Sequence, residues 1–507
     1  MSANKLRKLE GSVSSNSSAS TASKTHNTFY AEPCFKLVGV SVLSPSENVG
    51  SITLSSILSS GDLEEMVQIN YMVDIEYLIN QLPQSKRHSL RTTIVHGLRD
   101  ESAKNIRTVA LLYRNIKVVP VSMPITYGTH HTKAMLLFFT DGTMRVVIHT
   151  ANIIEREWCN KSQGVYMTPI LPRKRNDSSS CEFETDLINY FKSYSNNTMR
   201  EYGERLKNYD FSSVKAVLIA SVPGYHTKDS LLKWGHMRLR TVLGNRVTIP
   251  SSCQNDSTVI CQFSSIGSLG TKESWLKDEF FYSLSCSKNE KQSRDPDLKL
   301  IFPTVENVRD SLEGWSAGES LPFTHANYTK QKNYMIKYLC KWKAFDNGRE
   351  RAMPHIKTYT RLRANSPSEL SHESNAEVAW FLLTSSNLSK AAWGSLQKKG
   401  IQLMIRNYEL GVLFYPELFQ MDESIPVHLL NATLKNLKPS LPSFIVSESS
   451  TNSSKKRKRI DEESCQIVPI RIPYDLPLTL YDSKKDDCWT WDIPRKEIDW
   501  LGRSYLS

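Results

Sequence analysis

The chain has 507 residues, of which 39% are apolar, so it can form two or more domains with sizeable cores. Lys and Arg outnumber Asp and Glu by 64 to 52, and the net charge of +12 favours a polyanionic partner, either nucleic acid or an anionic membrane surface. No apolar run approaches the ~18 residues of a membrane span, no signal-peptide core is evident, and the nine cysteines include no Cys-x-x-Cys pair, so we expect reduced thiols in the cytosol or nucleus.

The first 30 residues are rich in Ser, Asn, Thr and Lys, which predicts a disordered tail because little apolar surface can be buried there. The short β-rich runs that we expect to form strands are Thr92–Val95, Lys117–Val121, Met135–Phe139, Arg145–His149 and Ala216–Ala220. Met72–Leu82 and Leu388–Gln397 have apolar residues three and four apart and are expected to be helical. This alternation predicts an α/β fold around a largely buried sheet.

Two segments interrupt the pattern. Ser221–Gly224 contains a proline and a glycine just after an expected strand, and we predict a domain boundary there, between residues 31–222 and residues 223–507. Residues 447–465 form a polar stretch that includes five consecutive cations, Lys455–Arg459. We expect a basic disordered loop that carries a nuclear localisation signal; a solvated charge run without that function would have the same composition.

An internal repeat carries the chemically informative residues. Its first copy contains His131, Lys133, Asn152 and Trp158, and its second contains His355, Lys357, Asn387 and Trp393. In both copies His-x-Lys is followed by an apolar strand, an Asn and, six residues later, a Trp. The His-to-Asn distance is 21 residues in the first copy and 32 in the second, and the polar insertion Arg363–Glu377 accounts for the difference. A single His-x-Lys is common in strands, whereas two such copies indicate a shared site.

This set of side chains suits a phosphodiester. Residues i and i+2 of a strand share a face, so each His and Lys can point to one place, and an Asn at the end of the next strand can join them. Lysine charges and asparagine amides stabilise a phosphate anion, while one His can act as nucleophile and the other as general acid near neutral pH. We expect no metal or other cofactor, because no carboxylate cage for Mg²⁺ is evident and His130, His131 and His149 are poorly placed for one ion.

The doubled H-x-K…N pattern resembles the phospholipase D superfamily. The Asp that usually follows each Lys in that superfamily is replaced here by Phe138 and Leu362, which is typical of its tyrosyl-DNA phosphodiesterase branch. The segments that are similar to this family are YGTHHTKAMLL, RVVIHTANI, QFSSIGSLG, AMPHIKTY, SSNLSKAAWG, QLMIRNYELGVLF and PYDLP, within residues 30–507. The resemblance implies two similar phospholipase D-like domains, each a mixed sheet flanked by helices, related by pseudo-two-fold symmetry.

The resemblance also implies a role for each matching residue. His131 would be the nucleophile, and His355 the general acid and later the base. The phosphate-binding residues would be Lys133, Lys357, Asn152 and Asn387, and the residues that orient the two histidines would be Gln163 and Glu409. The residues that line the DNA and substrate cleft would be Tyr127, Ser265, Ser268 and Trp491.

The implied function is repair, in the nucleus, of DNA with a blocked 3′ end, single-stranded or duplex. The enzyme would hydrolyse the 3′-phosphotyrosyl bond to a trapped type IB topoisomerase peptide through a phosphohistidine, leaving a 3′-phosphate. No membrane partner is expected, and one chain already holds both halves of the site, which favours a monomer. The alternatives are another phospholipase D-type nuclease or lipid phosphodiesterase, and a DNA-binding module without catalysis.

The stretch Tyr328–Lys343 alternates aromatic residues with lysines and allows two interpretations. It could follow a DNA backbone, with the aromatic rings stacking on bases. Equally, it could be an amphipathic helix that buries its aromatic residues and exposes its lysines.

Overall fold

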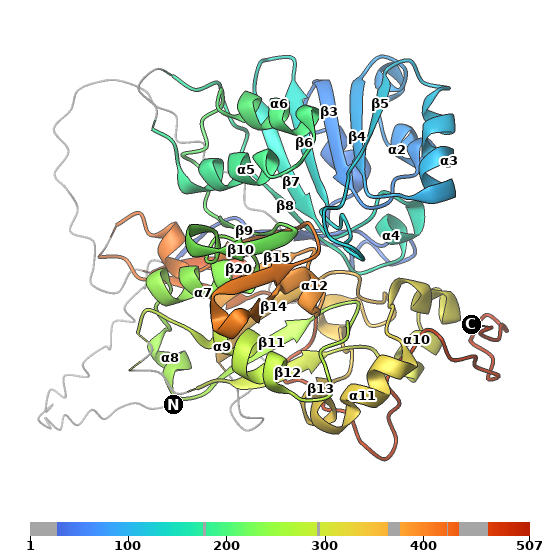
Figure 1. Ribbon diagram of the computed structural model, residues 1–507, viewed down its shortest axis with the longest axis vertical. Helices are drawn as coiled ribbons and strands as arrows, with labels where there is room; N and C mark the ends of the chain where they lie inside the picture. Colours follow the sequence, from blue (N-terminus) through green and yellow to red (C-terminus); the bar gives the residue numbers. More distant parts are fainter. Residues whose placement is uncertain are drawn as a thin grey trace, which may run out of the picture.

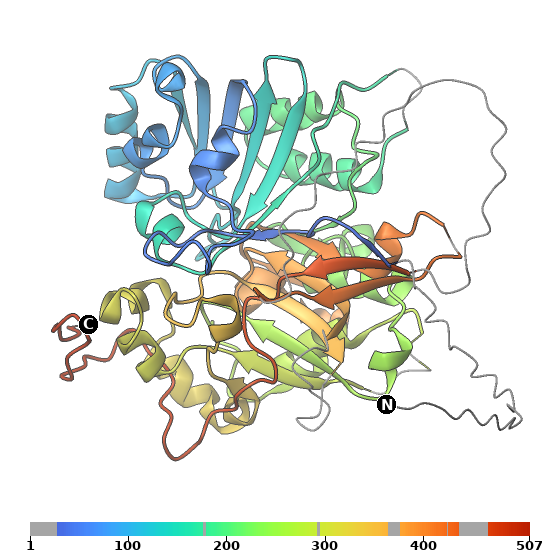
Figure 2. The ribbon, with the colours of Figure 1, turned by 180° about the vertical axis from the view of Figure 1, so that it is seen from behind.

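The protein is described here by a computed structural model, which covers residues 28–175, 179–289, 291, 295–363, 376–422, 424–434 and 465–506. The chain forms two lobes, with its N-terminal half in one and most of its C-terminal half in the other (Figure 1). Each lobe is built around a mixed sheet with helices beside it, and the same two lobes are seen from behind in Figure 2. Among the described residues no helix is long and apolar enough to span a bilayer.

The N-terminal lobe contains a seven-stranded sheet. Its strands, in spatial order, are β2 (Lys36–Leu37), β8 (Gly164–Met167), β7 (Met144–His149), β6 (Ala134–Phe139), β3 (Leu63–Asn70), β4 (Arg91–His96) and β5 (Ile116–Pro120). Strands β3, β4 and β5 are parallel to one another, and the others pair in antiparallel fashion. The sheet is therefore mixed, as the sequence predicted.

The apolar run of β6 forms a central strand because both faces of the sheet are covered. Leu136 and Phe138 point into the large core that includes α5 and α6 and continues into the second lobe. Met135 and Leu137 point to the opposite face, into a second core formed with the outer helices. A six-residue strand that is buried along its whole length needs apolar residues at every position, not at every second one.

The second lobe contains a ten-stranded sheet that repeats the order of the first. Its core strands, in spatial order, are β9 (Val217–Ser221), β18 (Glu409–Phe414), β15 (Glu377–Thr384), β14 (Thr358–Arg363), β11 (Ser257–Gln262), β12 (Asp297–Ile301) and β13 (Leu339–Cys340). The strand directions match those of β2-β8-β7-β6-β3-β4-β5 one for one. The sheet is extended by β19 (Val427–Asn431), β20 (Cys465–Ile470) and β1 (Thr28–Tyr30). The two lobes therefore share one topology, related by pseudo-two-fold symmetry.

Helices lie beside both sheets (Figure 1), and in the first lobe they cover both faces. The helices of the first lobe are α1 (Leu54–Leu58), α2 (Ile75–Asn80), α3 (Asp100–Ala110), α4 (Glu155–Cys159), α5 (Glu182–Lys192) and α6 (Asn197–Leu206). Those of the second are α7 (Gly235–Arg246), α8 (Ser251–Gln254), α9 (Tyr282–Ser285), α10 (Val305–Arg309), α11 (His325–Met335) and α12 (Lys390–Trp393). A separate small sheet is formed by β10 (Gly224–Thr227), β17 (Gln402–Ile405) and β16 (Ser395–Gln397).

The five expected strands are present with shifts of one residue at their ends, but both expected helices are shorter than predicted. Helix α2 begins only after Asp74, whose side chain accepts a hydrogen bond from the Tyr77 amide. The helical prediction for Leu388–Gln397 is wrong after Trp393. Gly394 has a φ of +95°, which ends the helix, and the next three residues form β16 against β17.

The stretch Tyr328–Lys343 forms α11, a short 3₁₀ turn and β13. Tyr328 and Trp342 are buried, whereas Lys330 and Lys332 are exposed, as expected for an amphipathic element. The possible contact with DNA stays a prediction.

Three sequence predictions concern residues that are partly or wholly outside the described part of the chain. They are the tail of residues 1–30, the insertion Arg363–Glu377 and the basic loop of residues 447–465. The domain boundary expected near residue 222 also stays a prediction. Strand β9, which precedes it, belongs to the sheet of the second lobe.

A buried arginine ties the N-terminal segment to the second lobe. Arg349 is fully buried and donates to the carbonyl of Glu47 (2.8 Å), to Asn48 Oδ1 (3.0 Å) and to Ser51 Oγ (3.0 Å). We expect Arg349→Met to lower the free energy of unfolding by about 2–4 kcal/mol, because several partly buried acceptors lose their donor. Thermal unfolding beside Arg200→Met, an exposed control, measures this. Equal melting temperatures of the two variants would contradict it.

Candidate active site

Each His-x-Lys pair lies in the extended segment that leads into a strand. His131 and Lys133 directly precede β6, and His355 and Lys357 directly precede β14. Both pairs were expected within strands, but the strands begin only after the lysines, at Ala134 and Thr358. The two lysines are fully buried, and each ammonium donates to the main-chain carbonyl of the histidine two residues before it.

The two lobes hold each other's histidines through matching main-chain contacts. The His131 amide donates to the Tyr408 carbonyl (2.9 Å), and the His355 amide donates to the Ser162 carbonyl (3.0 Å). The next residue after Tyr408 is Glu409, and the next after Ser162 is Gln163. Each lobe therefore presents its orienting side chain to the histidine of the other lobe. A crosswise arrangement of this kind requires both lobes to be packed together.

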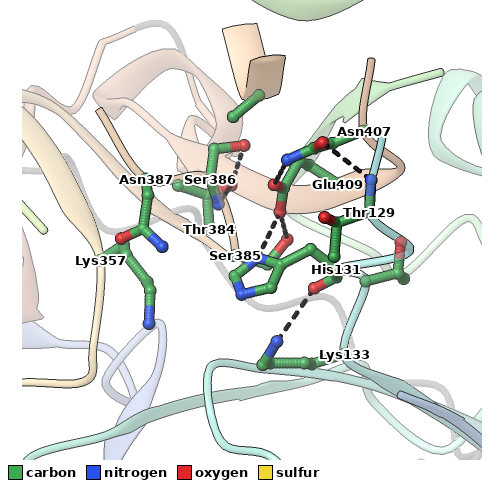
Figure 3. A network of polar contacts seen from close by, with 12 residues as sticks. Thr129, His131, Lys133, Lys357, Thr384, Ser385, Ser386, Asn387, Asn407 and Glu409 are labelled. Carbon is green, nitrogen blue, oxygen red and sulfur yellow. Dashed lines mark hydrogen bonds and ion pairs between the residues drawn. The ribbon is translucent and has the colours of Figure 1, made fainter. Parts of the chain in front are cut away.

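The imidazole of His131 is held by a buried carboxylate. His131 Nδ1 lies 2.9 Å from Glu409 Oε2, and the Glu409 side chain is only 1% exposed. Ser385 Oγ donates to the same oxygen (2.6 Å), and Asn407 Nδ2 donates to Oε1 (3.0 Å). Figure 3 shows this network, with Lys133, Lys357 and Asn387 beside the His131 ring. With Nδ1 donating to Glu409, the other ring nitrogen of neutral His131 keeps its lone pair free.

The imidazole of His355 has three neighbours at its Nδ1. Gln163 Nε2 lies at 3.1 Å, the Thr150 carbonyl at 3.2 Å and Glu157 Oε2 at 3.1 Å. The resemblance implied that Gln163 and Glu409 orient the two histidines, without saying which residue orients which. The structure places Gln163 at His355 and adds the carboxylate of Glu157.

The two asparagines follow their strands at the same offset, three residues after the ends of β7 and β15. Ser264 donates to Asn387 Oδ1 through both its amide (3.1 Å) and its hydroxyl (3.2 Å). The amide nitrogen of Asn387 is thus directed away from Ser264, toward the site. In contrast, Asn152 Nδ2 donates to Glu157 Oε1 (2.8 Å).

Burial lowers the pKa values of the two histidines and two lysines of the site. It lowers the pKa of His131, with Glu409 opposing the shift and Lys133 adding to it. It lowers the pKa of His355 well below its usual value, and the charges of Lys357 and Lys133 act in the same direction. Burial lowers the pKa of Lys133 to about 8 and that of Lys357 well below its usual range. The charged forms of these side chains are therefore destabilised in the free site, and a bound anion would stabilise them.

The four expected cleft residues have different surroundings. Ser265 Oγ donates to the Pro322 carbonyl (2.6 Å), and its loop runs beside Leu388, next to Asn387. Ser268 is exposed on the same loop. Trp491, which is 40% exposed, donates its amide to Phe323, adjacent to Pro322. Tyr127 is 83% exposed and has a φ of +61°, four residues before His131.

Several residues that support the site were not expected from the sequence. Thr150 Oγ1 donates to Gln163 Oε1 (2.7 Å), just as Ser385 donates to Glu409. Thr150 and Ser385 each lie two residues before the repeated Asn, so the repeat itself carried a signal for them. Glu157 gave no such signal, because Ala392 stands at its place in the second copy.

Histidines near the site show no arrangement for a metal ion. His130 is buried and faces away from His131, with its Nε2 3.0 Å from the Tyr194 hydroxyl. Within the described ranges, no cluster of three or more His, Cys, Asp or Glu side chains could hold a metal ion.

Comparison with known proteins agrees with the fold and with the family resemblance of the sequence. The family model described as tyrosyl-DNA phosphodiesterase matches residues 35–482. Tyrosyl-DNA phosphodiesterase 1 of Arabidopsis thaliana is 38% identical over 497 residues, covering 92% of this chain and 76% of the relative. The protein of that name from Drosophila melanogaster is 35% identical over 447 residues, with coverage of 85% and 69%. A crystal structure of yeast tyrosyl-DNA phosphodiesterase superposes with a TM-score of 0.63 at 21% identity, covering 90% of this chain and 99% of that one.

The repeated sheet topology and the likeness to the yeast structure define a two-lobed protein with a phospholipase D-like fold. The chain belongs to the tyrosyl-DNA phosphodiesterase family. It is therefore an enzyme, a hydrolase of phosphodiester bonds.

Proposed function

We propose that this enzyme hydrolyses the bond between a 3′-phosphate of DNA and a tyrosine or tyrosyl peptide left by a type IB topoisomerase. The observation that carries the proposal is the pair of His-Lys-Asn sets, one from each lobe, with each histidine oriented by a side chain of the opposite lobe. Two such sets provide a nucleophile, an acid and a cationic cradle for one phosphodiester.

In the proposed mechanism, His131 attacks phosphorus through the ring nitrogen that does not face Glu409. The tyrosyl oxygen leaves and takes a proton from His355, so that a phosphohistidine and a free tyrosine or peptide result. His355 then removes a proton from water, which attacks phosphorus and releases His131 and a 3′-phosphate. The charge of the bound phosphodiester favours the protonated state of His355, whose pKa is lowered in the free enzyme.

The phosphate oxygens would be held by Lys133, Lys357, Asn152 and Asn387. Lys133, Lys357 and Asn387 lie beside the His131 ring (Figure 3), and the two lysines and Asn152 are buried, which restricts their side-chain rotation. Protein cations would thus neutralise the developing charge, a role that a metal ion has in other phosphodiesterases. No metal or nucleotide cofactor is part of the proposal.

The DNA and the leaving peptide would extend from this centre over the residues that surround it. Ser265 and Ser268 are proposed to contact the DNA backbone, because their loop adjoins Asn387. Tyr127 and Trp491 are proposed to line the cleft as exposed aromatic side chains. A monomer suffices for the reaction, since both histidines come from one chain.

The test uses an oligonucleotide with a 3′-phosphotyrosine, incubated with the protein in excess EDTA. Conversion to the 3′-phosphate is expected with and without the chelator. Loss of activity in EDTA would contradict the two-histidine mechanism. Binding without cleavage would indicate a DNA-binding module, and vesicle binding with cleavage of phospholipids would indicate a lipid phosphodiesterase.

We expect kcat/KM to fall as the pH rises above about 8. Lys133 is charged below its pKa, and burial lowers that pKa to about 8, so phosphate binding weakens when the ammonium loses its proton. Initial rates at constant ionic strength between pH 6 and 10 measure this, with the increase expected in KM. A flat profile up to pH 10 would mean that Lys133 titrates at its usual value.

A nuclear location is proposed from the cations Lys455–Arg459, which lie outside the described residues. A fusion of residues 445–466 to a fluorescent reporter is expected to accumulate in nuclei. A reporter that stays cytoplasmic would contradict the claim that this segment suffices.

A further inference from the structure

Glu157 contacts three different groups of the site at once. It lies in α4 with only 3% of its surface exposed. Its Oε2 accepts from the Asn152 amide (2.5 Å) and lies 3.1 Å from His355 Nδ1, while its Oε1 accepts from Asn152 Nδ2 (2.8 Å). Gln163 Nε2 donates to Oε2 at 3.3 Å.

The fold itself does not require a carboxylate at this position. The second lobe has the same topology, and there the equivalent residue is Ala392. Its asparagine, Asn387, is fixed by Ser264 instead. Burying a carboxylate costs free energy unless it is paired. A buried carboxylate that stands at this repeat position in only one of the two lobes therefore indicates a specific role.

The hydrogen-bond geometry around His355 shows what that task is. To give a proton to a leaving group, His355 must be doubly protonated, and its Nδ1–H then needs an acceptor. Gln163 cannot provide it in the observed orientation, because its oxygen accepts from Thr150 and its nitrogen points to Nδ1. The acceptors within reach are the Thr150 carbonyl and the carboxylate of Glu157.

We propose that Glu157 is a positioning residue that holds His355 in its proton-donating form and fixes the amide of Asn152. This inference rests on the proposed function. Glu409 orients one histidine and Gln163 the other, yet the Nδ1 atom of each histidine faces a carboxylate. The surroundings of the two histidines are therefore more alike than Glu409 and Gln163 alone indicate. The carboxylate at His355 is supplied by the same lobe as Asn152, so one side chain aligns the acid with a phosphate donor.

The test compares two leaving groups on the same oligonucleotide. Tyrosine is a poor leaving group that needs a proton, because its phenol has a pKa of about 10. A 3′-p-nitrophenyl phosphate leaves readily without one. In single turnovers, Glu157→Gln is expected to slow release of tyrosine by at least about 10-fold, part of the ~10²–10⁴-fold that general acid–base catalysis contributes. Release of nitrophenol should change much less.

Glu155→Gln is the matched control, because it removes the same charge from an exposed position of the same helix. Glu157→Asp keeps the charge and should return the ratio of the two rates toward that of the wild type. Equal slowing of both substrates by Glu157→Gln, or no slowing of either, would overturn the inference. Failure of the wild type and of Glu155→Gln to release tyrosine would instead contradict the proposed function.

Discussion

Substitution of His131 by alanine is expected to reduce single-turnover release of tyrosine from a 3′-phosphotyrosyl oligonucleotide by ~10⁴-fold or more. The reason is that alanine offers no nucleophile, and water lacks the fixed position that Glu409 gives to the imidazole at 2.9 Å. Affinity for the oligonucleotide should remain, since Lys133, Lys357 and Asn387 still bind the phosphate. Fluorescence anisotropy measures that affinity, and quenched time courses measure the cleavage.

The matched control for this variant is His88→Ala, at an exposed histidine of the same lobe. It is expected to cleave at the rate of the wild type. Cleavage by His131→Ala within about tenfold of the wild-type rate would place the nucleophile elsewhere. Loss of both cleavage and binding would point to a collapsed site, and thermal unfolding would identify that outcome.

The second large effect is expected from His355→Arg, which should trap the enzyme on DNA. Arginine keeps a positive charge near the departing tyrosyl oxygen, so the first step continues at a reduced rate. It cannot accept a proton from water, because its pKa is far above neutral pH. Hydrolysis of the phosphohistidine should therefore slow by ~10²–10⁴-fold, the usual contribution of a general base.

The trapped species is a covalent conjugate of the protein with a labelled oligonucleotide, visible as a shifted band on a denaturing gel. It should be absent in the double variant with His131→Ala, which lacks the attacking ring. His88→Arg provides the matched control for the introduced charge. If His355→Arg forms no adduct while it still releases tyrosine, the two-step scheme is wrong.

The local patterns of the sequence predicted elements well wherever packing reinforced them. The run Met135–Phe139 forms a strand because both faces of its sheet are covered, as its continuous apolar character indicates. The prediction for Leu388–Gln397 failed at Gly394, where a positive φ ends the helix. The next residues pair with β17, a strand that lies further along the chain, and no local periodicity reveals such a partner.

The sequence by itself determined the repeat, and through it the composition of the site. The two copies of His-x-Lys and Asn are present in the sequence however the two lobes pack. The tertiary structure decided which side chains meet. Glu409 reaches His131, and Gln163 reaches His355, because the chain at each histidine pairs with the segment that leads into a strand of the opposite lobe.

The contacts of Glu157 were decided by the tertiary structure alone. Its place in the repeat is taken by an alanine in the second copy, so the sequence pattern contained nothing to single it out. Only the turn of α4 behind Asn152, together with the approach of the second lobe, brings its carboxylate to His355. Spacing along a chain fixes which groups a local element carries, whereas a contact between residues 198 positions apart depends on how two lobes pack.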